Sequence, residues 1–143
     1  MSTIKRAVPA ANSYTLTQPF WDGVKEARLM VQQCNKTGRL QWPPRPVSIY
    51  TGRSDLSWVA VSGKATLYSW TVTRSAWPGH EGRVPYVCAY AKLDEGIRVL
   101  CNLIDCKPEE LTPGMSLQLT WDYLDEGAPY PAFTPASDEG SQA

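Results

Sequence analysis

Two short segments of this chain have the spacing of paired zinc knuckles, so metal coordination is the first chemistry to consider. They lie within CNKTGRLQWPPRPVSIYTG, residues 34–52, where two C-x-x-C-G-like patterns flank a proline-rich connection. In a zinc ribbon each knuckle supplies two thiolates to a tetrahedral site, and its glycine lets the backbone turn tightly toward the metal. Both glycines, Gly38 and Gly52, and both two-residue gaps are present. The segment therefore has the outline of a rubredoxin-like zinc ribbon.

Only one of the four expected ligand positions carries a thiol. Cys34 occupies the first position, whereas Thr37, Ser48 and Thr51 occupy the others. Their hydroxyl groups stay protonated near neutral pH, and zinc prefers thiolate, imidazole or carboxylate ligands. We therefore expect neither zinc nor another cofactor. Two interpretations stay open on these residues alone: a degenerate ribbon that has lost its metal, or two glycine-terminated turns.

A ribbon without metal needs another source of rigidity. The connection PPRP restricts the backbone, because proline fixes one dihedral angle of each residue it occupies. We expect apolar packing to supply the rest. The side chains expected to provide it are Leu40, Trp42, Ile49 and Tyr50.

No group of residues in the sequence predicts a catalyst, so we expect no catalytic residues. His80 is the only histidine and lies in a glycine-flanked loop, where an exposed ring without a catalytic task is expected. Asp94 and Glu95 are adjacent in a hairpin turn, so their carboxylates point apart into water. The chain has no glycine-rich phosphate loop. A further acidic cluster is interpreted as solvated surface: Asp122, Asp125 and Glu126.

Composition favours one domain of mainly β structure. The chain has 143 residues, is 43% hydrophobic and contains 12 prolines and 10 glycines, which predict many turns and short strands. Its formal net charge is zero, which argues against binding driven by a phosphate backbone. The N-terminus lacks an apolar signal region, and no apolar run is long enough to cross a membrane. The four cysteines lack disulfide spacing, so we expect free thiols and a cytoplasmic, soluble protein without membrane contact.

The first third of the chain should form a helix and the ribbon. We expect a flexible arm over residues 1–16, then a helix and linker strand over 17–33, with the helix ending near Ala27. The degenerate ribbon follows over 34–56. Phe20 and Trp21 are adjacent on the short helix, so they cannot both face one small core, and one of them is free to contact a partner.

The rest of the chain should form a small barrel over residues 57–133, followed by a tail over 134–143. One long strand is expected from Trp58 to Val72, bent at Gly63 so that it serves two edges of the barrel. Further strands are expected over 85–93, 97–104, 116–123 and around 131–133, with one helical turn at 108–111. Five antiparallel strands with these features predict a barrel of the OB type.

The order of several segments resembles one known family. The segments are PFWDGVKEARLMVQQC, a ribbon containing PPRP, SWVAVSGKATLYSWTV, PYVCAYAKLDEGIRVLCNLIDC and then PEELTPGM. This order and spacing, over about residues 18–133, resemble the zinc-ribbon/OB-fold acyl-CoA-associated proteins called domain of unknown function 35, DUF35. The resemblance favours a degenerate ribbon over plain turns. The family pattern has four cysteines in the ribbon, and this chain departs from it at three of those positions.

The resemblance implies a role as a partner subunit. Members assemble with thiolase-fold enzymes that act on acyl-CoA, such as thiolases, acyltransferases and retro-aldolases, and some assemble with hot-dog-fold enoyl-CoA hydratases. The thiolase-fold subunit carries the chemistry, while the small subunit supports its fold and in some members helps to form the acyl-CoA channel. We therefore expect no activity from the chain alone, a hetero-oligomer in lipid, steroid or aromatic catabolism, and a ribbon retained for contact with the partner. The residues expected at the partner interface are Phe20, Trp21, Trp42 and Trp77.

The same resemblance suggests where an acyl-CoA would bind. The phosphates of CoA favour Arg or Lys, and its adenine favours a flat apolar face. The alternative is that these tryptophans belong to the core or an interface and that the arginines are ordinary surface charges. The candidate CoA-binding residues are Arg39, Arg45, Lys64, Tyr68, Trp70, Arg74 and Tyr86.

Two other functions compete with the partner-subunit interpretation. An OB barrel with exposed aromatic rings could bind single-stranded nucleic acid, although zero net charge argues against this and we expect no nucleic-acid partner. A self-sufficient acyl-CoA hydratase or thioesterase is the third possibility, and the lack of an acid–base pair argues against it.

Overall fold

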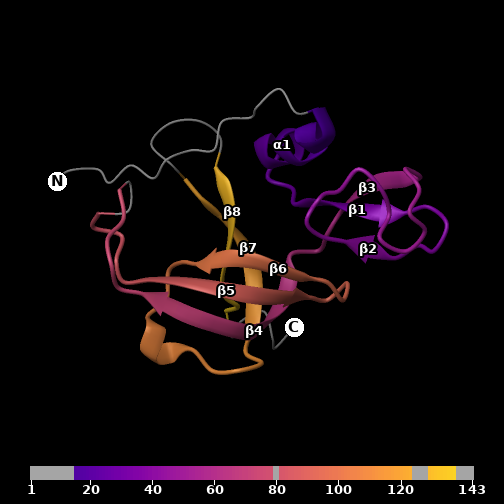
Figure 1. Ribbon diagram of the computed structural model, residues 1–143. Helices are drawn as coiled ribbons and strands as arrows, with labels where there is room; N and C mark the ends of the chain where they lie inside the picture. The colour runs from indigo at the N-terminus through magenta and orange to yellow at the C-terminus, as the bar shows by residue number, and fades with distance from the viewer. Residues whose placement is uncertain (1–14, 79–80, 124–128, 138–143) are drawn as a thin grey trace.

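The protein is described by a computed structural model that covers residues 15–78, 81–123 and 129–137. Figure 1 shows a helix and a small three-stranded sheet beside a closed five-stranded barrel. The expected fold class, mainly β with an N-terminal helix, a ribbon and a five-stranded OB-type barrel, is confirmed.

Several expected features lie outside the described residues. They are the arm up to residue 14, the tail from residue 138, and three side chains considered for chemistry, His80, Asp125 and Glu126.

The N-terminal helix is short, with eight residues and about two turns. Pro19 suits the first turn, and Phe20 and Val24, one turn apart, point into the core. Gly23 lies against the following strand, where a Cβ atom would come within 2.4 Å of the Met30 Cγ. The helix ends at Lys25, close to the expected end near Ala27. Its bounds are η1 Thr15–Thr17 and α1 Gln18–Lys25.

The ribbon is a three-stranded antiparallel sheet of order β2-β1-β3. The expectation of one continuous strand from Trp58 to Val72 is wrong, because its first residues belong to the third strand of the ribbon and the rest to the barrel. Residues up to Ala60 pair with β1, and the chain then turns at Gly63, whose φ is +87° and whose Cβ position lies 3.0 Å from the Leu119 Cβ. The strands are β1 Met30–Cys34, β2 Leu40–Gln41 and β3 Leu56–Ala60.

The barrel closes in the order β4-β5-β6-β8-β7. All of its strand pairs are antiparallel except β6 with β8, which are parallel, so the last strand crosses over to close the barrel. The hairpin between β5 and β6 forms at the expected place. The elements are β4 Lys64–Thr73, β5 Tyr86–Leu93, β6 Arg98–Leu103, η2 Pro108–Glu110, β7 Ser116–Asp122 and β8 Tyr130–Pro135.

The barrel core follows the two-residue period of its strands. Along β5 the expected inward set, Val87, Ala89, Ala91 and Leu93, is at most 3% exposed. Strand β4 breaks this period, because its register against β5 shifts between residues 67 and 69. The bulge adds Tyr68 on the outer side. The residues that face the core are therefore Ala65 and Leu67 before the bulge and Trp70 and Val72 after it.

An aromatic cluster joins the helix, the ribbon and the barrel. Phe20 lies edge-on to Trp21, with ring centroids 5.0 Å apart, and 5.8 Å from the Trp42 ring of the ribbon. Trp21 in turn lies 6.4 Å from the Tyr130 ring of β8. Such contacts add about 0.5–1.5 kcal/mol per pair beyond burial. The cluster therefore fixes the ribbon relative to the barrel.

Candidate functional site

The two knuckles of the ribbon have the same backbone geometry. In the first, the amide of Cys34 donates to the carbonyl of Arg39, and the amide of Gly38 donates to the carbonyl of Cys34, both at 2.8 Å. In the second, the amides of Ser48 and Gly52 make the equivalent two bonds, also at 2.8 Å. The two glycines have φ of +74° and +72°, values that favour glycine. Both turns therefore keep the form of a ribbon knuckle.

Hydroxyl groups take the places of the missing thiolates. Thr37 Oγ1 accepts a hydrogen bond from the amide of Arg39 at 3.2 Å, and Ser48 Oγ accepts one from the amide of Tyr50 at 3.1 Å. Hydrogen bonding by the hydroxyls of Ser48 and then Thr37 lowers the pKa of the Cys34 thiol to about 7, while burial acts in the opposite direction. The two knuckles therefore converge on the Cys34 sulfur, which is hydrogen-bonded to the hydroxyls of Ser48 and Thr37.

This ligand set does not fit zinc. It offers one thiol and three hydroxyls, and the described residues contain no group of three or more His, Cys, Asp or Glu that could hold a metal. Cys34 is fully buried, so its thiol is not accessible as a nucleophile. Burial also raises the pKa of the Cys101 thiol to about 12 and raises that of Cys106. These thiols are correspondingly poor nucleophiles at neutral pH.

Two buried glutamines hold the ribbon together. Gln41 Nε2 donates to Gln32 Oε1 at 2.8 Å and to the carbonyl of Val47 at 3.1 Å, and Gln41 Oε1 accepts from the amide of Ile49 at 2.8 Å. Gln32 bonds both backbone groups of Arg45, through Oε1 at 2.8 Å and Nε2 at 2.9 Å. The side chains are 1% and 2% exposed. The pair thus attaches the proline-rich connection to β1 and β2.

The expected apolar packing of the ribbon is only partly correct. Ile49 is 56% exposed, so it does not pack inside; its amide supplies the contact instead. Leu40 and Trp42 do pack against the core, and the Tyr50 hydroxyl donates to the carbonyl of Leu40 at 2.6 Å. Sequence reading missed the glutamines because a polar residue in a short strand is ordinarily assigned to the surface.

The CoA candidates of the ribbon do not form a phosphate site. The guanidinium of Arg39 lies 4.2 Å from the centroid of the Tyr50 ring, so it stacks on an aromatic face of its own domain. Arg45 is exposed and uses its backbone groups to bind Gln32.

The CoA candidates of the barrel are spread over its two ends. Lys64 begins β4, whereas Arg74 follows its last residue and Tyr86 pairs with that end. Ten strand residues span about 30 Å, so these groups cannot contact one phosphate. The bulge turns Trp70 inward, opposite Ala89, where it packs against the core. The seven candidates are therefore too far apart to bind one phosphate together, and contact of any one of them with an acyl-CoA stays a prediction.

A hollow of about 580 Å³ lies where β4 meets β7. Lys64 is the one CoA candidate among the residues that line it, and Asp94 lines it as well. The two opposite charges give this hollow no strong preference for an anion.

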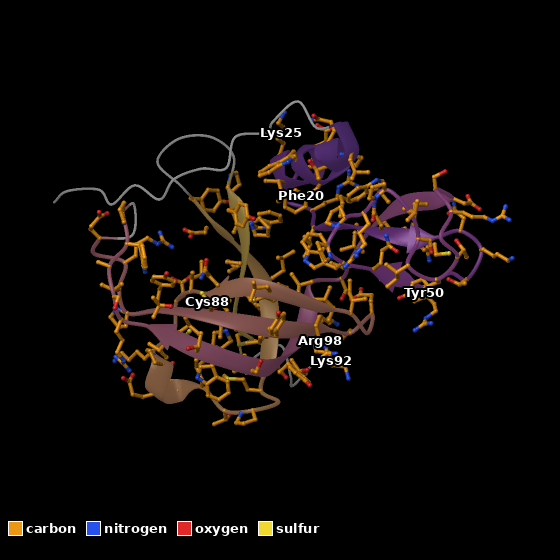
Figure 2. The ribbon with its side chains drawn as sticks, viewed as in Figure 1. Phe20, Lys25, Tyr50, Cys88, Lys92 and Arg98 are labelled. Atoms are coloured by element: carbon orange, nitrogen blue, oxygen red, sulfur yellow. The ribbon has the colours of Figure 1, made fainter. Side chains whose placement is uncertain are left out.

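One CoA candidate, Tyr68, does lie among cations. Its ring is 54% exposed, and the Arg98 guanidinium lies 4.6 Å from its centroid. Lys92 is the direct cross-strand neighbour of Arg98. Figure 2 shows both cations on the part of the barrel nearer the ribbon. The sequence did not predict these two cations as neighbours of Tyr68, because only the register of β4, β5 and β6 brings Tyr68, Lys92 and Arg98 together. Counting residues outward from the hairpin turn could have paired Lys92 with Arg98.

The four predicted interface residues have different environments. Phe20 is 7% exposed and belongs to the core, so its ring is not available to a partner, which corrects that expectation. Trp21 and Trp42 are half-buried in the aromatic cluster. Trp77 is 68% exposed in the loop between β4 and β5.

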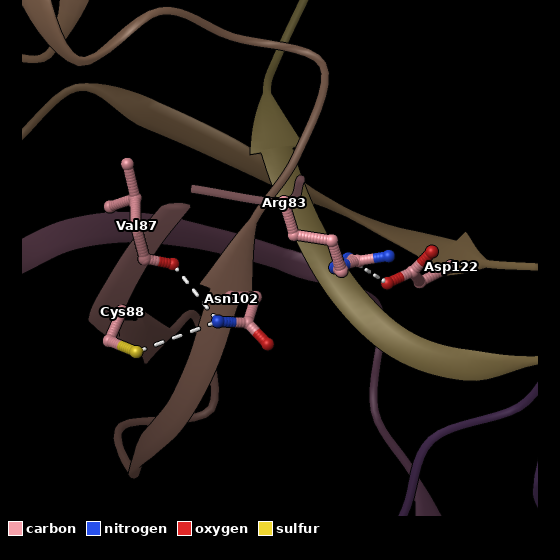
Figure 3. Close-up of polar contacts among 5 residues, drawn as sticks. All are labelled: Arg83, Val87, Cys88, Asn102 and Asp122. Atoms are coloured by element: carbon pink, nitrogen blue, oxygen red, sulfur yellow. Dashed lines mark hydrogen bonds and ion pairs between the residues drawn. The ribbon is translucent and has the colours of Figure 1, made fainter. Parts of the chain in front are cut away.

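Two acidic side chains of the described residues, Asp122 and Glu95, serve structural contacts. Asp122 was expected on a solvated surface, but it is only 9% exposed and forms an ion pair with Arg83 at 2.7 Å (Figure 3). Glu95 Oε2 accepts from the amide of Ser62 at 2.8 Å, which ties the β5–β6 hairpin to the turn before β4. Figure 3 also shows Asn102 bridging the Val87 carbonyl and the Cys88 sulfur across β5 and β6. No acid–base pair poised for catalysis is found among these residues.

Comparison with known proteins decides the family. Residues 21–47 match the family described as "ChsH2, rubredoxin-like zinc ribbon domain", and residues 58–122 match "ChsH2, C-terminal OB-fold domain". A "DUF35 domain-containing scaffold protein" of Pyrococcus furiosus is 34% identical over 101 residues, 70% of this chain and 74% of the relative. The chain belongs to the DUF35 family. The knuckles are therefore those of a ribbon, not plain turns.

Two further relatives come from enzyme complexes. A "Probable enoyl-CoA hydratase alpha subunit" of Thermomonospora curvata is 34% identical over 119 residues, 82% of this chain but 37% of the relative. The chain thus spans little more than a third of that relative's length. A solved structure described as "Ltp2-ChsH2(DUF35) aldolase" contains a chain that is 30% identical, with a TM-score of 0.80, over 91% of this chain and 100% of that chain. In the described part of this DUF35 chain, no helix is long and apolar enough to span a membrane.

Replacing Gln32 by Leu should destabilise the ribbon. The change leaves the Gln41 amide and both backbone groups of Arg45 without their buried partner, and each such group costs about 1–3 kcal/mol. We expect Gln32→Leu to lower the free energy of unfolding by at least about 2 kcal/mol in urea denaturation. Gln33→Leu, on the same strand, loses one exposed bond to the Gly38 carbonyl and should cost less than about 1 kcal/mol. Equal effects of the two changes would contradict the role of the buried pair.

The knuckle geometry should accept zinc once the ligands are restored. The triple change Thr37→Cys, Ser48→Cys and Thr51→Cys supplies the three missing thiolates. We expect the triple variant to bind one zinc per chain in elemental analysis and to lose thermal stability with chelator. The same variant with Cys34→Ser should bind zinc more weakly.

The unaltered chain should contain far less than one zinc and show no change in melting temperature with chelator. Tightly bound zinc at one per unaltered chain would contradict the expectation that the ribbon holds no metal. A triple variant that stays metal-free would show that the four positions do not converge.

Proposed function

We propose that this DUF35 chain is a non-catalytic partner subunit of a thiolase-fold acyl-CoA enzyme, a retro-aldolase or thiolase that cleaves a carbon–carbon bond. The observation that carries the proposal is the similarity to the DUF35 chain of the Ltp2-ChsH2 aldolase, which extends over the whole of that chain. The similarity to part of a hydratase alpha subunit supports the same area of metabolism and adds a hot-dog-fold enoyl-CoA hydratase to the expected partners.

The side chains agree with a role in support of another subunit. Cys34 is buried, Asp122 is ion-paired with Arg83, and Glu95 accepts from a backbone amide. None of these described groups forms a nucleophile–base arrangement. In this proposal the partner supplies the catalytic groups. The chain stabilises the partner's fold and contributes to the entrance of its acyl-CoA channel.

Co-expression tests this function. The chain is produced with each thiolase-fold protein encoded in the same genome, and the mixtures are analysed by gel filtration. We expect one thiolase-fold protein to co-elute with the chain in a stable complex and to cleave acyl-CoA faster in the complex than alone. The isolated chain should not turn over acyl-CoA thioesters. Separate elution from every thiolase-fold protein, or full activity of the thiolase-fold protein alone, would refute the proposal.

Binding of single-stranded nucleic acid is the second candidate function. Tyr68 and Tyr90 are 54% and 45% exposed on the outer side of the barrel, where aromatic rings can stack on bases. A fluorescence titration with an oligonucleotide at low salt decides this point. Binding that weakens steeply with added salt would favour this candidate, and we expect none.

A further inference from the structure

The outer side of β4, β5 and β6 carries an exposed apolar surface, which we call the outer barrel face. It consists of Tyr68, Tyr90 and Leu100 with the cations Lys92 and Arg98. Tyr90 and Leu100 are direct cross-strand partners. Tyr68 is the extra residue of the β4 bulge, and Ser69, the residue after it, pairs with Tyr90. The three apolar side chains are 54%, 45% and 62% exposed. Three neighbouring strands thus present large apolar groups to solvent at one place.

This surface has the composition of a protein interface. Tyrosine and arginine are enriched among residues that contribute most to binding, and a pair of strands holds them with little conformational freedom to lose. Arg98 lies over the Tyr68 ring at 4.6 Å, so its guanidinium is already positioned beside the apolar centre. Folding does not require large side chains at positions 90 and 100, because both face solvent and the barrel core is filled from the inner side of these strands.

The charges on this face indicate the chemistry of its partner. Lys92 and Arg98 lie directly opposite each other on adjacent antiparallel strands. Like charges in that position lower the stability of a sheet. In the described ranges, neither cation has a carboxylate within ion-pairing distance. The pair therefore offers two uncompensated positive charges at the edge of an apolar surface, which a carboxylate of another protein would neutralise.

We propose that the outer barrel face docks the thiolase-fold subunit through an apolar patch bordered by Asp or Glu. This inference rests on the proposed function and names the face by which that partner binds. Tyr68, Tyr90 and Leu100 form the buried centre of the contact. Lys92 and Arg98 pair with the acidic border.

The change Lys92→Glu separates docking from folding. It places an acidic residue opposite Arg98, which removes the like-charge pair and leaves the Arg98–Tyr68 stack in place. The melting temperature should therefore stay the same or rise. Affinity for the thiolase-fold protein that co-elutes with the unaltered chain should fall at least tenfold, and the association rate should depend less on salt. Leu100→Ser should weaken the complex by about 30-fold without unfolding the chain, since this side chain is exposed.

Matched changes at the other end of the barrel serve as controls. Lys107 is an exposed lysine beside η2. Tyr123 is 78% exposed and follows Asp122. Asp122 pairs with Arg83 of the β4–β5 loop, which places Tyr123 near that loop. Lys107→Glu and Tyr123→Ser should change the affinity by less than about twofold. Affinities are measured by surface plasmon resonance with the unaltered chain alongside.

The outcomes distinguish this inference from the function it rests on. If the unaltered chain binds the thiolase-fold subunit and Lys92→Glu and Leu100→Ser bind equally well, the face is wrong and the function stands. If the unaltered chain binds no thiolase-fold subunit, both fail. Self-association of the chain abolished by these changes would assign the face to a second copy and overturn the inference. Oligonucleotide binding lost in Lys92→Glu would equally overturn it.

Discussion

The ribbon of this protein depends on one buried hydrogen-bonded pair, Gln32 with Gln41. Between them the two amides satisfy backbone groups at three positions of the connection, Arg45, Val47 and Ile49. A buried polar network is favourable only when its members are paired, since an unpaired amide in the interior costs more than the bond gains. That requirement makes the pair specific: an apolar side chain of equal size would leave the connection without partners. Zinc ribbons use a metal to join two knuckles, whereas here side-chain amides join the strands to the connection between the knuckles.

The aromatic cluster transmits that rigidity to the rest of the chain. Trp42 follows the strand that carries Gln41, and its ring meets Phe20 of α1, which meets Trp21 and through it Tyr130 of β8. The ribbon, the helix and the barrel are therefore one connected apolar contact system. A chain built in this way can hold two surfaces, the ribbon and the outer barrel face, at a fixed spacing.

Much of this fold could be predicted from the sequence, because local patterns determine it. Alternation along Val87–Leu93, the Asp94–Gly96 turn and the two knuckle glycines each constrain the backbone within a few residues. The errors concern long-range pairing. Nothing local indicates that Trp58–Ala60 pairs with β1 or that Asp122 meets Arg83 of a distant loop. The candidate site was harder still, because the seven CoA residues were grouped by type. Two of them lie in the ribbon, and the strand register spreads the other five along the barrel.

The bulge at Tyr68 lets β4 carry one residue more than its partner strand without losing a core position. Upstream of it Ala65 and Leu67 face the interior, and downstream of it Trp70 and Val72 do so, although an unbroken alternation would turn the second pair outward. Many side chains would be sterically acceptable at position 68 itself, which lies on the surface. Deleting that single residue would place Leu67 and Ser69 in succession opposite Ala91 and Tyr90, so the strand would become regular and Trp70 and Val72 would still face the core. The deletion would remove the ring that lies beneath the Arg98 guanidinium. Position 68 is thus expendable for the barrel core, and its side chain serves the outer surface.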